Sequence, residues 1–102
     1  MLVRLGEAGA VPAGEMRVFE IEGTKLNVAN AGGALYAFDD TCTHMGCSLA
    51  RGELEGTTVT CACHGSQFDV TSGAVLRGPA QRPVRSHRIA VEDGAIYAEP
   101  EG

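Results

Sequence analysis

The sequence predicts an all-β fold, an antiparallel β-sandwich or barrel with a small subdomain inserted at about residues 40–80. Three observations lead to this prediction. Short runs rich in β-branched residues alternate with glycine-bearing turns. Two of these turns, Glu22-Gly23 and Asp93-Gly94, have the composition of tight hairpins. No segment repeats apolar residues with a helical period over a convincing length. Together they favour sheets with short connections.

The N-terminal half is expected to form four strands. A break at residues 12–14 follows the first strand, Glu22-Gly23 joins the second to the third, and residues 30–33 turn into the fourth. The expected strands are residues 2–5, 16–21, 24–29 and 34–38. The fourth strand leads directly into a loop with cysteine and histidine residues, so we expect the sheet to position that loop.

The C-terminal half is expected to complete the sheets. Residues 57–60 are all β-branched and end at Cys61, so a second cysteine loop also follows a strand. The remaining expected strands are residues 67–70, 74–76, 84–91 and 95–98. A short helical turn is expected at residues 48–51. In the predicted strand 84–91, the side chains of His87, Ile89 and Val91 are expected to share the face that points to the interior, because alternate residues of a strand lie on the same face.

Composition and charge limit the function. At 102 residues the chain supports one domain, residues 1–102. A net charge of -5 opposes binding to nucleic acid or anionic lipid and favours partners with basic docking surfaces. No apolar stretch approaches the length of a membrane span, and Glu7 interrupts the segment where a signal peptide needs an apolar core. We therefore expect a cytoplasmic protein without a membrane span.

The chemistry is concentrated between Cys42 and His64. All four cysteines and two of the three histidines lie within these 23 positions. They form two half-sites, a Cys-x-His at residues 42–44 and a Cys-x-x-His at residues 61–64. Two thiolates and two imidazoles suit a tetrahedral structural zinc ion or a 2Fe-2S cluster held by two cysteines and two histidines. Spacing alone leaves both open.

The flanking residues resemble the Rieske family, over about 40 residues and in the family's order. The matching motifs are Cys42-Thr-His44-Met-Gly-Cys47, Cys61-Ala-Cys63-His64-Gly-Ser66, Phe68-Asp69, Thr71-Ser72-Gly73 and Gly78-Pro79-Ala80. The resemblance implies a Rieske-like fold in which the subdomain at about residues 40–80 binds one 2Fe-2S cluster. It also implies that Cys42 and Cys61 hold the buried iron and that His44 and His64 hold the outer one. Neutral imidazoles ease the addition of an electron, which is why Rieske potentials lie above those of plant-type ferredoxins.

The resemblance further implies a disulfide between Cys47 and Cys63 that ties the two loops together. Many dioxygenase-type Rieske ferredoxins lack this pair, so here the chain is locally similar to the cytochrome-complex type. Because cytosolic thiols are normally kept reduced, two buried free thiols are the alternative.

Five further residues are expected around the cluster. Gly46 and Gly65 allow backbone amides to approach the sulfurs. Ser66 matches the position whose hydroxyl bonds a bridging sulfide in high-potential members, and Phe68 stands where those members have tyrosine. One donor is kept and one is lost, so we predict an intermediate potential. Pro79 belongs to a loop that covers the cluster.

The expected function is that of a one-electron carrier, a soluble Rieske-type ferredoxin that passes electrons from a flavin reductase to a terminal oxygenase or another oxidoreductase. No nucleophile-and-base pair, phosphate loop or pocket for an organic substrate is evident, so we do not expect an enzyme. The alternatives are a small subunit of a nitrite-reductase-like enzyme and a zinc-stabilised interaction module. His87 is expected to pack rather than to bind metal. The arginines of residues 77–88 are expected to form a solvated strand face.

Overall fold

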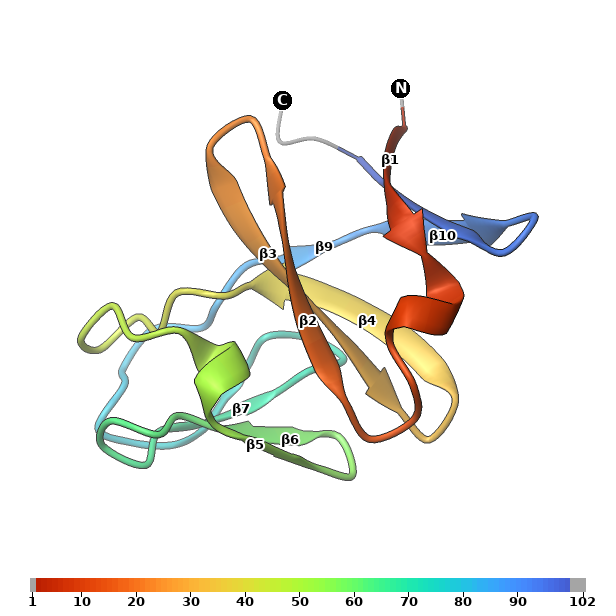
Figure 1. The fold of residues 1–102 in the computed structure, drawn as a ribbon. Coiled ribbons are helices and arrows are strands. Elements are labelled where there is room, and N and C mark those ends of the chain that lie inside the picture. Colours follow the sequence, from red (N-terminus) through yellow and green to blue (C-terminus); the bar gives the residue numbers. More distant parts are fainter. Residues whose placement is uncertain (1, 100–102) are drawn as a thin grey trace.

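A computed structural model describes residues 2–99, which form eleven strands and two short 3₁₀ helices in three antiparallel sheets (Figure 1). The central sheet has the order β2–β3–β4–β9, a second sheet has the order β1–β11–β10, and a third has the order β5–β6–β7–β8. The strands of the central sheet are Met16–Ile21, Thr24–Ala31, Ala34–Asp39 and Ser86–His87. Those of the second, in spatial order, are Val3–Glu7, Ala95–Ala98 and Ile89–Glu92. Those of the third are Glu53–Glu55, Thr58–Thr60, Gln67–Asp69 and Val75–Arg77. The all-β prediction is confirmed.

Both predicted hairpin dipeptides form the turns expected of them. Glu22 and Gly23 have φ angles of 48° and 83°, and Asp93 and Gly94 have 51° and 77°. Two consecutive positive φ angles are typical of the two-residue turns that match the twist of antiparallel strands. The first turn joins β2 to β3 and the second joins β10 to β11.

The central sheet is covered on both faces, because neighbouring residues of β3 and β4 belong to different core clusters. Val28 and Ala37 pack in a cluster with Val11 and Ile96, on the side of the second sheet. Their neighbours Ala29 and Phe38 pack in a larger cluster with residues of the third sheet and its loops. Since successive side chains of a strand point to opposite faces, one strand pair anchors both outer sheets. The third sheet therefore shares its core with the central sheet.

The predicted strand 84–91 is wrong as a single element. Ser86–His87 forms β9 beside β4, whereas Ile89–Glu92 forms β10 beside β11. The chain leaves one sheet and enters another at Arg88, which interrupts the expected alternation. Val91 is 50% exposed instead of facing the interior.

Two short elements were not predicted, and a third was. The 3₁₀ helix η1 at Ala8–Ala10 and the strand β5 were not expected. The 3₁₀ helix η2 at Leu49–Arg51 confirms the helical turn expected at residues 48–51. β5 follows Gly52, where an added Cβ would lie 1.8 Å from the carbonyl oxygen of Thr60. Only glycine permits this close approach of the two backbones.

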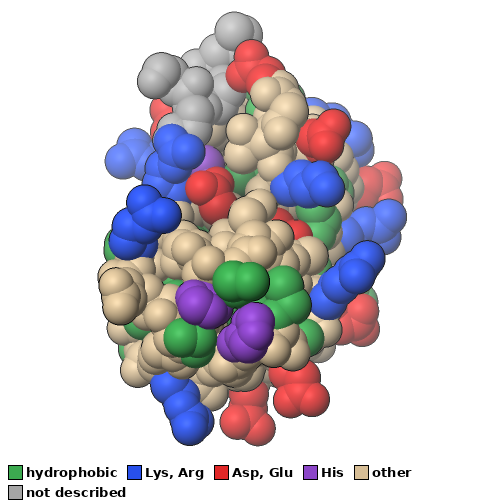
Figure 2. Space-filling view, turned by 90° about the vertical axis from the view of Figure 1, so that its left-hand side faces the viewer, with side chains coloured by type: hydrophobic (Ala, Val, Ile, Leu, Met, Phe, Trp, Pro, Cys, Tyr) green, Lys and Arg blue, Asp and Glu red, His purple; other side chains and the backbone are tan. Residues whose placement is uncertain are grey.

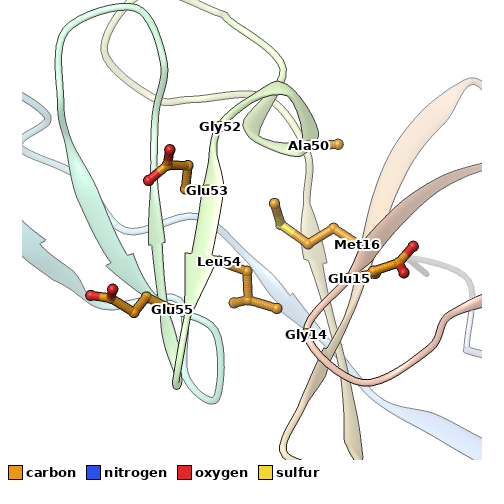
Figure 3. A pocket seen from close by; sticks show the side chains of 8 residues that line it. All are labelled: Gly14, Glu15, Met16, Ala50, Gly52, Glu53, Leu54 and Glu55. Atoms are coloured by element: carbon orange, nitrogen blue, oxygen red, sulfur yellow. The ribbon is translucent and has the colours of Figure 1, made fainter.

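A groove separates the start of β2 from β5 (Figure 3). Met16 and Leu54 face each other across it, with Glu53 and Glu55 on one side and Glu15 on the other. The carboxylates point away from this apolar pair in opposite directions, so they do not gather around a common point.

Candidate metal centre

Two loops of nearly identical backbone carry the predicted ligands. The first loop, residues 41–48, follows β4, and the second loop, residues 61–66, joins β6 to β7. In the first loop the N–H of Cys42 donates to the carbonyl of Cys47 (2.8 Å) and that of Gly46 donates to the carbonyl of Cys42 (2.9 Å). In the second loop the N–H of Cys61 donates to the carbonyl of Ser66 (2.8 Å) and that of Gly65 donates to the carbonyl of Cys61 (3.1 Å).

Glycine is required at one place in each loop. Gly46 and Gly65 occupy equivalent positions and have φ angles of 76° and 79°. A residue with a Cβ adopts this left-handed region only at a cost, whereas glycine enters it freely. The two glycines thus let both loops turn in the same way and direct their side chains toward one place.

The loops place two thiols inside and two imidazoles outside. Cys42 and Cys61 are free thiols, each 2% exposed, in the core cluster shared with the central sheet. His44 and His64 are exposed, their ring centroids are 5.2 Å apart, and their planes are nearly perpendicular at 88°. Figure 2 shows two neighbouring histidine side chains on this face, among hydrophobic side chains.

A disulfide joins the first loop to the second. It links Cys47 and Cys63, which are 16 positions apart in sequence, and it confirms the pairing expected from the resemblance. The sulfurs of Cys47, Cys61 and Cys63 all lie within 4.8 Å of one another. Because two of these sulfurs are bonded to each other, the three do not form a three-thiolate site.

A third loop, residues 78–83, is tied to both of the others. The hydroxyl of Thr43 in the first loop donates to the carbonyl of Arg82 at 2.6 Å. The backbone N–H of Ala80 donates to the hydroxyl oxygen of Ser66 in the second loop at 3.0 Å. With the disulfide, these bonds connect the three loops pairwise. The two thiols and two imidazoles are therefore held in a braced frame.

Comparison with known proteins identifies the family. The Rieske [2Fe-2S] domain family matches residues 1–88. The chain belongs to the Rieske family. It is 33% identical to the ferredoxin component of biphenyl 2,3-dioxygenase from Rhodococcus jostii, over 99% of this chain and 94% of that protein. It is also 33% identical to the cytochrome b6-f complex iron-sulfur subunit of Chlorobaculum tepidum, over 90% of this chain.

The chain spans only half the length of that cytochrome-complex subunit, but nearly the full length of the dioxygenase ferredoxin. Solved structures agree on the fold. The ferredoxin of carbazole 1,9a-dioxygenase from Nocardioides aromaticivorans superimposes with a TM-score of 0.94 over 99% of both chains at 26% identity. A ferredoxin solved in complex with the reduced oxygenase of carbazole 1,9a-dioxygenase gives 0.90 at 31% identity, over 95% of this chain and 91% of that one.

Membership of the Rieske family implies a 2Fe-2S cluster of the Rieske type, and the donors of the site fit one. Two buried sulfurs and two exposed ring nitrogens are the mixed set that such a cluster takes from its protein. Burial raises the pKa of the Cys61 thiol, and the neighbouring Cys42 raises it further, while backbone hydrogen bonds from Cys63 and His64 lower it. A metal bound by this sulfur would favour the thiolate, so its binding would release a proton.

Ser66 and Phe68 are both fully buried around the Rieske site. The hydroxyl oxygen of Ser66 accepts the Ala80 N–H, which leaves its own hydrogen free to donate. Phe68 packs in the core cluster that contains Cys42 and Cys61, and it offers no donor. Pro79 is exposed in the third loop, next to the buried Ala80.

Asp40 is a supporting residue that the sequence did not indicate. Its carboxylate is 2% exposed and accepts hydrogen bonds from Asn27 Nδ2 (3.0 Å), from the Ala50 N–H (2.9 Å) and from the Ser48 hydroxyl. Asp40 directly precedes the first loop, and these bonds connect the start of that loop to its end and to β3. A buried carboxylate with several donors is stable because its charge is compensated. Nothing in the sequence distinguishes it from a surface aspartate.

His87 binds a carboxylate of the scaffold. Its Nε2 lies 2.6 Å from Asp39 Oδ1, and its side chain is 5% exposed. This agrees with the predicted packing role. No helix within residues 2–99 is long and apolar enough to cross a membrane.

Proposed function

We propose that this chain is a one-electron carrier in which Cys42 and Cys61 hold the inner iron of the cluster and His44 and His64 hold the outer iron. One observation carries the proposal. Two loops of matching backbone bury two free thiols and expose two neighbouring imidazoles in a member of the Rieske family. The cluster, when bound, accepts and releases a single electron.

The protein residues determine where that electron leaves. The thiols lie in the core, so the scaffold closes the inner side of the site. The imidazoles lie at the surface, so a partner protein can contact them directly. Four protein ligands leave no open coordination position for an organic substrate, and the chain itself therefore catalyses no reaction of such a substrate.

The partners follow from the relatives. A flavin reductase is proposed as the donor and a terminal oxygenase as the acceptor, because a dioxygenase ferredoxin matches this chain almost end to end and a related ferredoxin has been solved with its oxygenase. The disulfide and the similarity to a cytochrome-complex subunit distinguish the chain from a standard dioxygenase ferredoxin. Ser66 keeps one hydroxyl donor of the high-potential members and Phe68 lacks the other, which supports a potential between the low and high Rieske classes.

Metal content and spin test the proposal. Freshly purified protein should contain about two iron and two sulfide ions per chain and give a reduced-state electron paramagnetic resonance signal of low average g. His44→Asn and His64→Asn should each abolish that signal. His87→Asn is the matched control, because this histidine binds Asp39, and it should retain the signal. A colourless protein with one zinc ion would instead support the interaction module.

A further inference from the structure

The charge of the chain is distributed very unevenly around the imidazoles. We define the tip as residues 41–52, 61–66 and 77–83, which comprise the three loops, η2 and Arg77. Asp40 directly precedes the first loop but is buried and hydrogen-bonded, so it is not part of this surface. The tip contains three of the eight basic residues, Arg51, Arg77 and Arg82, and none of the thirteen acidic residues. The rest of the chain therefore carries five basic and thirteen acidic residues. A protein of net charge -5 thus carries three positive and no negative side chains in the region around the imidazoles.

The backbone of each tip arginine lies next to one of the two loops that carry the imidazoles. Arg82 belongs to the third loop, and its carbonyl accepts the hydroxyl of Thr43, the residue before His44. Arg51 ends η2 and lines a cavity together with Gly46 and the disulfide cysteines. Arg77 ends β8, where it pairs with Gln67, the residue that follows the second loop. The three arginines therefore belong to three different segments of the chain.

These guanidinium groups are available to a partner. All three residues are exposed, and within the described part of the chain none has an ion pair. In Figure 2, Lys and Arg side chains stand on both sides of the histidine pair, whereas Asp and Glu side chains lie at the lower edge, at the right edge and in the upper part of this face. Glu53, two positions after Arg51, is exposed at the border of the tip. Met45 is 61% exposed beside His44 and adds an apolar contact to the centre.

We infer that the tip docks onto an acidic surface of a partner protein, in which carboxylates surround an apolar site that receives the two imidazoles. This inference rests on the proposed electron-carrier function and adds the charge of the partner. The acidic partner surface inferred here is the opposite of the basic surface that the net charge of -5 alone predicts. Charge close to the contact outweighs distant charge because salt screens interactions beyond about 8 Å at physiological ionic strength.

Small inorganic oxidants of opposite charge test the inference without the partner. Cluster-loaded, reduced protein is mixed in stopped flow with the anion hexacyanoferrate(III), which takes one electron and becomes hexacyanoferrate(II) while the cluster returns to its oxidised state. The second-order rate should fall by about tenfold as the ionic strength rises from about 10 to 200 mM, as expected for attraction. With the cation tris(1,10-phenanthroline)cobalt(III) the rate should rise over the same range.

Variants locate the effect. Arg51→Gln, Arg77→Gln and Arg82→Gln should each slow the reaction with hexacyanoferrate(III) at low salt, and the triple variant should lose the fall with ionic strength. Arg4→Gln removes the same charge from β1, which lies far from the tip in Figure 1, and should leave the rate unchanged within about twofold. Glu53→Gln should speed the reaction.

The outcomes separate this inference from the function itself. A rate with hexacyanoferrate(III) that rises with salt, or equal effects of Arg4→Gln and the tip variants, would overturn the acidic partner and leave the electron carrier intact. Protein without iron or without the reduced-state spin signal would overturn the proposed function before the kinetic experiment begins. Each variant is compared by that same spin signal, so loss of the cluster is recognised separately from loss of attraction.

Discussion

Phe68 occupies the position at which a single hydroxyl group can change the electron affinity of the site. Its ring is fully buried on β7, in the core cluster that contains both free thiols. High-potential members of the family have tyrosine at the matching position. A donor to a sulfur stabilises the reduced and more negative cluster.

Phe68→Tyr should therefore raise the reduction potential. One hydrogen bond of about 0.5–1.5 kcal/mol corresponds to about 20–60 mV for a one-electron couple. Protein-film voltammetry of the loaded protein measures the shift. Phe19→Tyr on β2, which packs in the cluster of the second sheet, is the control and should leave the potential unchanged. An unchanged or lower potential in Phe68→Tyr would count against this account of the site.

Ser66 combines two roles that separate measurements can distinguish. As an acceptor it pairs with the Ala80 N–H, and its free hydrogen can donate to the cluster. Ser66→Ala should lower the free energy of unfolding by about 1–3 kcal/mol, because the Ala80 N–H loses its buried partner. It should also lower the potential. Ser72→Ala, at an exposed serine that accepts the Ala74 N–H, should change neither. A destabilised variant with an unchanged potential would limit Ser66 to bracing the loops.

Among the structural elements, the first and second loops have equivalent backbones, but the side chains at one equivalent position differ and make different links to neighbouring loops. Each loop closes with the same two hydrogen bonds and the same left-handed glycine. The position that is Cys47 in the first loop is Ser66 in the second. Cys47 therefore forms the disulfide to Cys63, while Ser66 accepts a hydrogen bond from the third loop. The three loops are thus connected by one covalent link and by hydrogen bonds.

The disulfide should stabilise the folded chain mainly by restricting the unfolded one. The double variant Cys47→Ser, Cys63→Ser should lose about 2–5 kcal/mol of unfolding free energy. Urea denaturation measures the loss, and dithiothreitol should reproduce it in the parent protein while leaving the double variant unchanged. Alkylation of denatured, non-reduced protein should label only Cys42 and Cys61. Labelling of all four cysteines would show that the pair is reduced in solution.

At the scale of the whole molecule, the cluster-binding subdomain is bound to the central sheet by a shared core. Phe38 of β4 packs in the same cluster as Leu49, Val59 and Phe68 of the subdomain. No separate core therefore supports the third sheet among the residues that the structure describes. We expect the site and the scaffold to unfold as one cooperative unit.

Phe38→Ala should lower the free energy of unfolding by about 3–5 kcal/mol, because it removes a fully buried ring. Thermal unfolding followed by far-ultraviolet circular dichroism and by the visible absorbance of the cluster should give coincident transitions. Val91→Ala, at a half-exposed position, should cost only about 0.5 kcal/mol. Loss of the visible absorbance well below the loss of secondary structure would show that the subdomain opens independently.

The all-β class, the two hairpin turns and the two half-sites could be predicted from the sequence alone, because each depends on residues close together in the chain. A dipeptide such as Asp93-Gly94 favours a tight turn wherever it occurs, and Cys42 with His44 shares a loop by spacing alone. The family motifs around those half-sites then indicated the type of cluster.

Other features depend on contacts between distant segments, and these could be established only from the folded chain. These include the disulfide between Cys47 and Cys63, the burial of Asp40, the change of sheet at Arg88 and the bond that holds the Arg82 backbone against Thr43 of the first loop. Burial and proximity are set by how whole elements pack, and a residue's neighbours in sequence say little about them. The net charge sums over the whole chain, whereas the attraction of a docking partner depends mainly on charges within a screening length of the contact. The distribution of charge in the folded protein therefore matters more for docking than its sum.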